Sequence, residues 1–364
     1  MSLLTPAHIH ALAAAACAAP SADNKHVIRI ETSTESLRLL ATPEFQSAQA
    51  SRRILGLIST GAVAENLILR ARRLGLRLEP TWHPGNSSDP VLAHFSCHSA
   101  PAVEDALDRA IETRHTNRRI RFIGPTLPPA AQDQLFSECS EIAGTHLIWL
   151  DEPERRRRAL QLIRWAEAER FRNQELHREM FDSIRFDVGW RGTATEGLLP
   201  GSLELPAVER PAFSLLRHWK VQRAANLLGT HRFIGFRAAD LPCRLAPHLC
   251  AISADGDLEP SALNAGRLLQ RVWLRATVLG MSFQVFAASA IYALDSSTAI
   301  PTELRRRLAS GWKELEPLGK PLVVFRMGHA KAASLCAGRP SPQSLLTATS
   351  KAVDQCSKDD GAAV

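Results

Sequence analysis

The sequence predicts a mixed α and β fold (α+β) in which two similar halves are joined in one chain. The first observation is an internal repeat, because LRARRLGLRL at 69–78 and LRATVLGMSF at 274–283 share Leu-Arg-Ala and then Leu-Gly at the same spacing. The second is that both halves mix helical periodicity with short extended apolar runs. The third is size, since 364 residues with 45% apolar content can form one large domain or two ordinary ones. Chance could produce the repeat in a chain rich in Leu, Arg and Ala; a duplicated half is the alternative.

The first half begins with a helix over 6–18, for which Thr5 is the N-cap and Pro6 the first helical residue. A strand over 26–31 follows the polar loop APSADNKH, which holds more turn formers than a connection needs. The remaining predicted elements are helices over 44–59 and 61–75, an extended segment over 76–82, a GNSSDP turn, a strand over 91–96 and a helix over 101–113.

The second half contains long helices and four strands. Helices are predicted over 128–142, 152–180, 212–228 and 261–280, and strands over 146–150, 248–253, 282–287 and 320–327. The segment 187–211, DVGWRGTATEGLLPGSLELPAVERP, is too long and too rich in Gly and Pro for a plain connector. Such a segment is typical of a lid, and a disordered insertion is the other interpretation.

The chain has a net charge of +7 and a sequence pI of about 9.3, which raises the question of an anionic partner. The densest basic run, RRRR at 155–158, follows Asp151, Glu152 and Glu154, and this mixture of charges predicts a solvated helix face. No basic patch interleaved with aromatic residues accompanies it, so nucleic acid is not an expected partner.

The cysteines and the apolar runs indicate the cellular compartment in which the protein works. Seven cysteines lack CxxC or metal-ligand spacing, and their odd number argues against a full disulfide framework. A signal peptide carries Lys or Arg before its apolar run, but no Lys or Arg precedes the apolar run near this N-terminus. No apolar stretch approaches the roughly 20 residues of a membrane-spanning helix. We therefore expect a cytoplasmic protein with no membrane partner.

The sharpest chemical motif is TRHTNRRIRF at 113–122. Three arginines and two hydroxyl groups within seven residues offer the N–H and O–H donors that bind a phosphate dianion. Ile120 and Phe122 could anchor the segment in a core. Basic runs between helices are usually solvated, so the motif alone leaves both interpretations open.

Together, two motifs resemble a known family. RHTNR at 114–118 resembles the R-[HR]-[ST]-x-[RK] signature of the nitroreductase family of flavoproteins, and PSADNKH at 20–26 resembles its P-S-[SAG]-x-N-x-Q segment. In that family the first motif contacts the phosphate and the flavin ring, and the second reaches the isoalloxazine from the other subunit of a dimer. Here both motifs stand in one chain.

Three further segments look like the single-chain, Acg-like branch of this family: 175–206, VLGMSFQVFAA at 278–288, and PLVVFRMGHA with GRPSPQSLL near the C-terminus. Acg-like proteins are understood as fused pseudo-dimers that hold one FMN beneath a lid. The resemblance implies a nitroreductase-like three-layer α-β-α fold with a first half over 1–113 and a second over 114–364. It also implies a flavin site that is complete within one chain.

The resemblance assigns roles residue by residue. Arg114 and Thr116 would hold phosphate or ribityl oxygens, Arg118 would lie near flavin N1 and O2, and Arg339 matches a C-terminal phosphate-binding arginine. A cation beside N1 and O2 stabilises reduced flavin. The loop against the ring is matched by Pro20, Ser21, Ala22 and Asn24, and the backbone facing flavin N5 by Ala287 and Ala288.

Two departures bear on catalysis. The family's Gln-Pro-Trp is replaced by His26-Val27-Ile28, so His26 either supplies the expected hydrogen bond or is a solvated histidine at the start of a strand. The common Glu-Gly at the N5 position is here Ala287-Ala288, which puts a substrate-orienting acid in doubt. No particular catalytic residue is therefore predicted.

Other chemistries find little support. The sequence has no GxSxG, HExxH or GxGxxG, and His8 and His10 would point apart on a helix, so no metal is expected. The sequence thus predicts an FMN-binding oxidoreductase that passes hydride through flavin N5 from NAD(P)H or another donor to an electron-poor substrate. A flavin-binding module without turnover is the main alternative, and a protein whose flavin site has decayed is the third.

Overall fold

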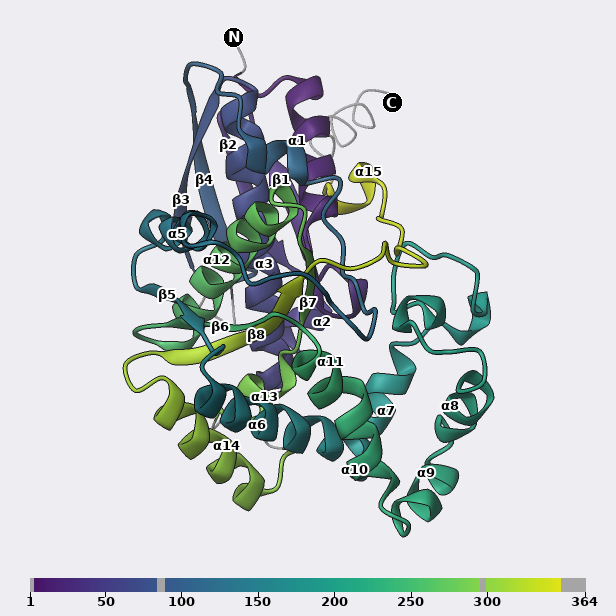
Figure 1. Cartoon of the computed structure of the whole chain (residues 1–364). Coiled ribbons are helices and arrows are strands. Elements are labelled where there is room, and N and C mark those ends of the chain that lie inside the picture. The colour runs from purple at the N-terminus through teal and green to yellow at the C-terminus, as the bar shows by residue number, and fades with distance from the viewer. Residues whose placement is uncertain (1–2, 84–88, 295–298, 348–364) are drawn as a thin grey trace, which may run out of the picture.

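A computed structural model describes residues 3–83, 89–294 and 299–347 of the chain. The described residues form a mixed α and β fold with two four-stranded antiparallel sheets (Figure 1). The strand orders are β1-β2-β4-β3 and β5-β6-β8-β7, so the two sheets have the same topology. Each sheet also carries one register shift between its second and fourth strands.

The first sheet is made of β1 (Ile28–Thr32), β2 (Ser36–Ala41), β3 (Leu76–Trp82) and β4 (Val91–Ser99). Its helices are α1 (Pro6–Ala18), the short α2 (Pro43–Gln46), the long α3 (Ala50–Arg73) and α4 (Ala106–Ala110). Thr5 caps α1 by accepting from the N–H of His8, as predicted.

The second sheet is made of β5 (Thr145–Trp149), β6 (His248–Ala254), β7 (Ser282–Val285) and β8 (Lys320–Gly328). Helix α5 (Pro129–Ser137) precedes it, α12 (Leu258–Val278) joins β6 to β7, and α13 (Ala288–Ile291) and α14 (Thr302–Leu315) join β7 to β8. Between β5 and β6 lie α6 (Pro153–Arg172), α7 (Gln174–Asp182), α8 (Arg210–Leu216), α9 (Trp219–Asn226), α10 (Thr230–Gly235) and α11 (Leu241–Arg244). The chain ends with α15 (Pro342–Leu345), which lies beside α1 and β1.

The internal repeat of the sequence occupies equivalent places in the two sheets. In both copies a long helix ends, a glycine adopts a left-handed conformation, and the third strand of the sheet begins. The glycines are Gly75 (φ 74°) and Gly280 (φ 70°), where a residue with a side chain would be strained. The predicted helix-to-strand joint is therefore confirmed in both copies.

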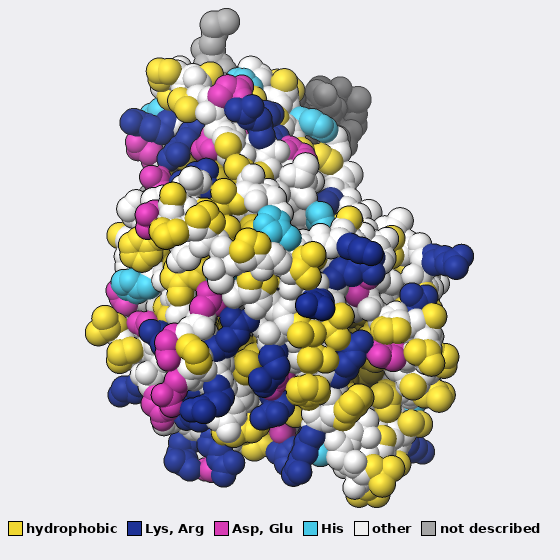
Figure 2. All heavy atoms as spheres, viewed as in Figure 1, with side chains coloured by type: hydrophobic (Ala, Val, Ile, Leu, Met, Phe, Trp, Pro, Cys, Tyr) yellow, Lys and Arg dark blue, Asp and Glu magenta, His cyan; other side chains and the backbone are white. Residues whose placement is uncertain are grey.

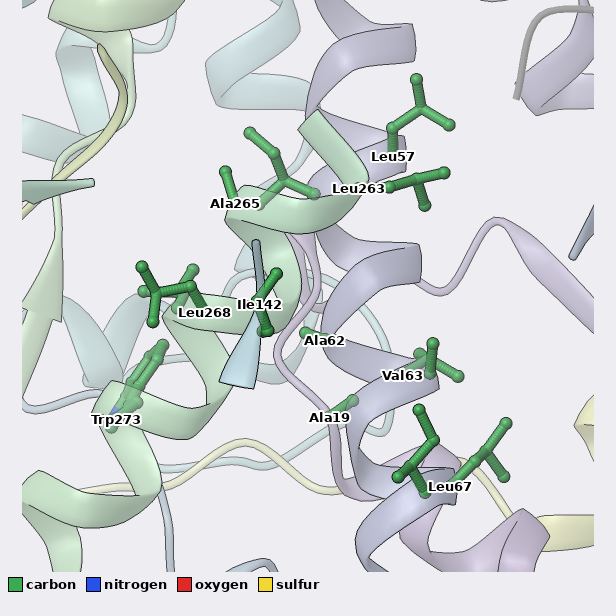
Figure 3. Packing of buried hydrophobic residues seen from close by; sticks show 14 of the residues in the cluster. Ala19, Leu57, Ala62, Val63, Leu67, Ile142, Leu263, Ala265, Leu268 and Trp273 are labelled. Atoms are coloured by element: carbon green, nitrogen blue, oxygen red, sulfur yellow. The ribbon is translucent and has the colours of Figure 1, made fainter. Parts of the chain in front are cut away.

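Helices α3 and α12 cross in the manner of a two-fold contact. A Cβ added to Gly61 would lie 2.0 Å from the carbonyl oxygen of Leu263, and one added to Gly266 would lie 2.0 Å from that of Ile58. Gly266 follows Gly61 by 205 residues, and Leu263 follows Ile58 by the same number, so the two contacts are reciprocal. Figure 3 shows buried hydrophobic side chains of the two helices around this crossing, among them Leu57 and Leu263.

Polar pairs across the α3–α12 contact are reciprocal as well. Gln270 donates to Asn66 at 2.6 Å, and Arg271 donates to Glu65 at 2.8 Å. With the 205-residue offset, Gln270 is the counterpart of Glu65 and Arg271 is the counterpart of Asn66. Each half thus presents matching positions of one helix to the other.

Helix α3 corrects two sequence-based statements. It runs unbroken through Gly61 instead of forming two helices, because that glycine serves the close approach of α12. It is also long and apolar enough to cross a membrane by length and composition, with an 18-residue window of mean hydropathy 1.4. Because 94% of that window is buried inside the protein, α3 acts here as a core helix.

Several other boundaries differ from the prediction. The strand over 26–31 is part of a hairpin of β1 and β2, the helix over 152–180 breaks at Asn173 into α6 and α7, and the helix over 101–113 shrinks to α4. The strand over 282–287 ends at Val285, and 288–291 is helical. Part of the predicted GNSSDP turn, 85–88, lies outside the described residues. The six described cysteines are free.

Candidate functional site

The 20–26 loop, the 113–122 motif and the C-terminal arm, residues 329–347 after β8, lie close together although they are far apart in the sequence. Arg114 Nη2 donates to the carbonyl of Ala18 at 2.9 Å, directly before the loop at 20–26. Arg339 Nη1 donates to Asn24 Oδ1 at 2.6 Å. The positive charges of Arg114 and Arg339 are close enough for Arg339 to lower the pKa of Arg114. The three segments therefore form one cationic cluster within one chain.

Arg114 is a buried cation that lacks a counter-ion. Its side chain is 3% exposed, and its guanidinium lies 4.4 Å from the centre of the Trp273 ring. Burial lowers the pKa of Arg114 well below its ordinary value, with a smaller contribution from Arg339. Its Nε is buried without a hydrogen-bond partner, and no carboxylate in the described part of the chain pairs with it. Such a group is costly unless an anion binds it, because arginine stays protonated.

Arg118 and Arg339 are half-buried cations that also lack a carboxylate partner in the described part of the chain. Neither makes an ion pair with any residue that the structure describes, and burial is the main factor that lowers the pKa of each. For Arg118 the pKa falls to about 10, although the charges of Asp23 and Glu204 act in the opposite direction. Arg118 donates only long hydrogen bonds, of 3.4 and 3.5 Å, to the hydroxyl and carbonyl of Ser202. The cluster thus presents three guanidinium groups without carboxylate partners.

Arg326 shows what a structurally satisfied buried arginine looks like in the same protein. It donates to Gln284 Oε1 at 3.0 Å and to the carbonyls of Ile120, Pro242 and Arg119, and its guanidinium stacks on Phe122. These bonds use neutral acceptors and hold the segment after Arg118 in place. The sequence analysis missed Arg326; its signal was a lone arginine in the apolar run PLVVFRMG.

Asn117 and Thr116 fix the motif to the edge of the second sheet. The N–H of Asn117 donates to the carbonyl of Phe283 at 3.0 Å, and Thr116 forms a β-bridge with the same residue. The Asn117 side chain donates to Ser282 Oγ and to the carbonyl of Lys331. The 113–122 motif is therefore not a solvated basic run between helices, since β7 and the C-terminal segment around Lys331 hold it.

The loop at 20–26 has an unusual backbone. Asp23 and Asn24 adopt left-handed conformations with φ of 53° and 55°, which non-glycine residues rarely do and which cluster at functional sites. The N–H of Ala22 donates to Ser59 Oγ at 3.2 Å, and Asp23 pairs with Arg52 at 2.8 Å. The hydroxyl of Ser21, next to Pro20, is buried and has no partner among the described residues.

His26 is buried, which rules out the interpretation of a solvated strand-start histidine. Its Nε2 lies 3.1 Å from the carbonyl of Cys17, so this nitrogen carries the proton and donates. Burial lowers the pKa of His26 to about 4, with further contributions from Arg339 and Arg114. The imidazole is therefore neutral near pH 7. Nδ1 remains for any other hydrogen bond.

The segment 187–211 lies against all three parts of the cluster. Asn24 donates to the carbonyl of Thr195 at 3.1 Å, and the N–H of Gly338 donates to Ala194 at 3.0 Å. Ser202 contacts Arg118, as described above. Glu204 accepts from the N–H of Ser334 at 2.5 Å and pairs with Arg119 at 3.1 Å. The segment is thus bonded to the 20–26 loop, to the 113–122 motif and to the C-terminal arm.

Ala287 and Ala288, the residues predicted to face flavin N5, are not linked to the cationic cluster by hydrogen bonds between described residues. Ala287 and Ala288 lie at the start of α13, just after β7. The hydrogen bonds of the described residues do not connect them to the three arginines. A charged group that the sequence did not reveal lies near the 20–26 loop: Arg52 bridges Asp23 and Glu179 of α7. A long-range ion pair of this kind leaves no local signal in a sequence.

The basic run 155–158 is only partly the solvated helix face that was predicted. Arg157 and Arg158 pair with Glu154 and Glu314. Arg156 is mostly buried, pairs with Asp151 and donates to the carbonyl of Cys243. A surface hollow of about 600 Å³ on this side is lined by ion-paired arginines and lies away from the cationic cluster. In the ranges that the structure describes, no group of three or more His, Cys, Asp or Glu residues could hold a metal.

No protein-family model matches the chain, and no curated protein matches it. Solved structures similar to this chain include an FMN-bound nitroreductase from Desulfitobacterium hafniense DCB-2, with 14% identity, 68% of this chain and 100% of that chain covered, and a TM-score of 0.35. Nitroreductase A from Vibrio parahaemolyticus RIMD 2210633 has 10% identity, 71% and 87% coverage, and a TM-score of 0.38. The FMN-dependent nitroreductase NfnB from Mycobacterium smegmatis in complex with NADPH has 17% identity, 62% and 88% coverage, and a TM-score of 0.34. Likenesses this distant decide neither family nor activity.

Proposed function

We propose that this chain binds FMN in the cationic cluster beneath the segment 187–211. The observation that carries the proposal is the set of three guanidinium groups, on Arg114, Arg118 and Arg339, that lack carboxylate partners. Buried cations are normally neutralised, and a bound phosphate would supply the missing charge together with acceptors for the unbonded Nε of Arg114.

The residues present fit the group. Arg114, Arg339 and Thr116 would hold the phosphate and ribityl oxygens, and Arg118 would lie at the pyrimidine end of the ring, where a cation favours the reduced form. Pro20, Ser21, Ala22, Asn24 and His26 would form the wall against the ring. The partnerless hydroxyl of Ser21 and the free Nδ1 of His26 offer polar contacts there.

We further propose that the protein is an oxidoreductase of nitroreductase type. Bound FMN supplies a centre that accepts hydride from NAD(P)H or another donor and delivers it to an electron-poor substrate. The chain's own contribution is to bind, to orient and to exclude water. The backbone of Ala287 and Ala288 would face the reacting edge of the ring, and the absence of an acid at these positions leaves substrate orientation to other groups.

A specific observation favours the second candidate, an FMN-binding module without turnover. The segment 187–211 is hydrogen-bonded to the 20–26 loop, to Arg118 and to the arm near Gly338. A cover fixed at three places would hold the cofactor and hinder a nicotinamide. Anaerobic mixing with NADPH separates the candidates, since rapid bleaching of the flavin supports the reductase and its absence supports the module.

We propose that the site is complete in one chain because the chain is a fused pseudo-dimer of a half over 1–113 and a half over 114–364. The equal strand orders and the reciprocal α3–α12 contacts support the duplication. FMN stoichiometry should then be one per chain and independent of protein concentration down to nanomolar levels. Flavin release in step with dissociation of a dimer would place residues of two chains at the site.

The visible spectrum of the purified protein tests FMN binding itself. We expect flavin absorbance as purified or after incubation with FMN, and weaker binding of riboflavin, which lacks the phosphate. A protein that stays colourless after incubation with FMN overturns the proposal. Equal affinities for FMN and riboflavin would show that the cationic cluster does not bind the phosphate.

A further inference from the structure

The surface formed by residues 208–233, on α8, α9 and α10, concentrates exposed hydrophobic side chains. Among the described residues eleven large hydrophobic side chains are exposed, and six of them lie here: Val208, Leu215, Val221, Leu227, Leu228 and Phe233. Leu227 and Leu228, between α9 and α10, are 88% and 91% exposed. Figure 2 shows hydrophobic side chains gathered at the lower right, where Figure 1 places these helices. Scattered exposed hydrophobic residues need no explanation, but a group marks an interaction site.

The same region carries most of the net charge of the chain. Residues 210–239 contain six Lys or Arg residues and no Asp or Glu, a net charge of +6 against +7 for the whole chain. Arg237 pairs with Glu209, outside this stretch. Arg217, Lys220, Arg223 and Arg232 are exposed and make no ion pair with any described residue. Elsewhere in the chain basic and acidic residues nearly balance.

Helix α9 presents both kinds of residue on its outer side. Its inner side is fixed by Gln222, which is buried and donates to Asn226 at 2.7 Å, and by Asn226, which donates to the carbonyl of Phe171. The positions on either side of Gln222, namely Lys220, Val221 and Arg223, face solvent. Apolar and basic side chains alternate over one outward surface, which continues through Leu227 and Leu228 into α10.

We propose that the 208–233 surface binds anionic phospholipid bilayers, with Leu227 and Leu228 entering the interface and the four unpaired cations contacting headgroups. An anionic bilayer offers a negatively charged surface with apolar material directly beneath it, which matches exposed hydrophobic side chains set among cations. This binding is peripheral and needs no membrane-spanning helix. It revises the sequence-based expectation of no membrane partner, and it is independent of the proposed FMN site.

Flotation with lipid vesicles tests the proposal on the full chain as purified. We expect binding to vesicles of equal parts phosphatidylcholine and phosphatidylglycerol, little binding to phosphatidylcholine alone, and loss of binding at high salt. The double variant Lys220→Glu/Arg223→Glu should bind at least about 25-fold more weakly, since each surface cation contributes about fivefold. Leu227→Ser/Leu228→Ser should weaken binding by about tenfold for each side chain.

A matched control changes the same residue types elsewhere. Leu318, 87% exposed, and Lys313 lie outside this surface, so Leu318→Ser/Lys313→Glu should bind vesicles like the unchanged protein. All the substituted side chains are exposed, and circular dichroism should confirm that each variant folds. Absence of binding to anionic vesicles overturns the proposal. Equal weakening by the control variant would also overturn the proposal. So would a finding that the surface binds another copy of the chain or an acidic protein and does not bind anionic vesicles.

Discussion

Replacement of Arg114 by methionine should weaken FMN binding while it leaves the empty protein almost as stable as before. We expect the stability of the apoprotein to change little and the affinity for FMN to fall about thirtyfold. Methionine keeps much of the side-chain volume and packing against Trp273 while it removes the charge. A residue that is present for stability would not show this separation.

The magnitudes follow from the contacts of Arg114. In the apoprotein the substitution removes one hydrogen bond to Ala18, about 1.5–3 kcal/mol for a charged donor, and a cation–π contact, about 0.5–2 kcal/mol. It also relieves the burial of a cation without a counter-ion and of an unbonded Nε, a cost of about 1–3 kcal/mol or more. The ranges of these opposing contributions overlap, so we expect a small net change in stability. In the complex a charge-assisted contact of about 2 kcal/mol is lost, which is about thirtyfold in affinity.

Two measurements and one control check this prediction. Urea unfolding of the apoprotein gives the change in stability, and titration of FMN and riboflavin by fluorescence gives the affinities. The control is Arg70→Met, because Arg70 is also buried but donates to the fully buried Asp108 at 2.6 Å. Its removal leaves the buried Asp108 with Arg73 as its remaining cation, at 3.1 Å, and should therefore destabilise the apoprotein without changing FMN affinity.

Either of two results would show that Arg114 does not bind the phosphate of FMN. If Arg114→Met destabilises the apoprotein as much as Arg70→Met, the guanidinium is a structural cation. If the variant loses riboflavin and FMN affinity equally, the side chain does not contact the phosphate.

The remaining predictions concern four other features. Arg339→Ala should weaken FMN binding about thirtyfold, and the double variant with Arg114→Met should lose less than the sum of the two, because both would share one phosphate; unchanged retention on dialysis contradicts this. Between pH 6.5 and 4 the unfolded chain binds a proton that the neutral, buried His26 does not, so lowering the pH should cost up to about 3 kcal/mol of stability, and His26→Gln should reduce this slope in urea unfolding; equal slopes refute it. Gly61→Ala should lower the thermal midpoint, since its Cβ would meet the Leu263 carbonyl, and an unchanged midpoint would show that the helices separate freely. Shortening 190–204 to a Gly/Ser linker should speed flavin reduction by NADPH and weaken FMN retention; no change in either would show that the segment is not a lid.

Local sequence signals were sufficient to predict the two helix-to-strand connections, but not the β1–β2 hairpin. The Leu-Gly pairs ending at Gly75 and Gly280 predicted a helix end and a following strand, because only glycine readily takes that left-handed conformation. The β1–β2 hairpin was missed, since its turn at Ser33–Ser36 lacks Gly and Pro. Gly61 was mistaken for a helix boundary because its role lies in a contact with a residue about 200 positions away.

Residue types were enough to choose candidate residues that lie close together, but they did not reveal which partners those residues have. Arg114, Asn24 and Arg339 were chosen from motifs, and the structure brings them into one cluster. The burial of His26 was not predictable, because it depends on α1 and on the two arginines beside it. Neither was the role of Arg326, whose acceptors come from three separate segments of the chain.

Acidic groups near the cluster are available, and they are used elsewhere. Asp23 lies inside the 20–26 loop but pairs with Arg52. Glu204 lies beside the 113–122 motif but pairs with Arg119 of that motif and not with Arg114 or Arg118. Both carboxylates influence Arg118 only at longer range. A fold selected for stability alone would gain by moving either acid onto the uncompensated cations, since an unpaired buried charge is among the most expensive features a protein can carry. The chain keeps that charge uncompensated while it neutralises Arg70 and Arg271 in the core. The cost is recovered only when an anion occupies the cluster, and for this reason we place the phosphate of FMN there.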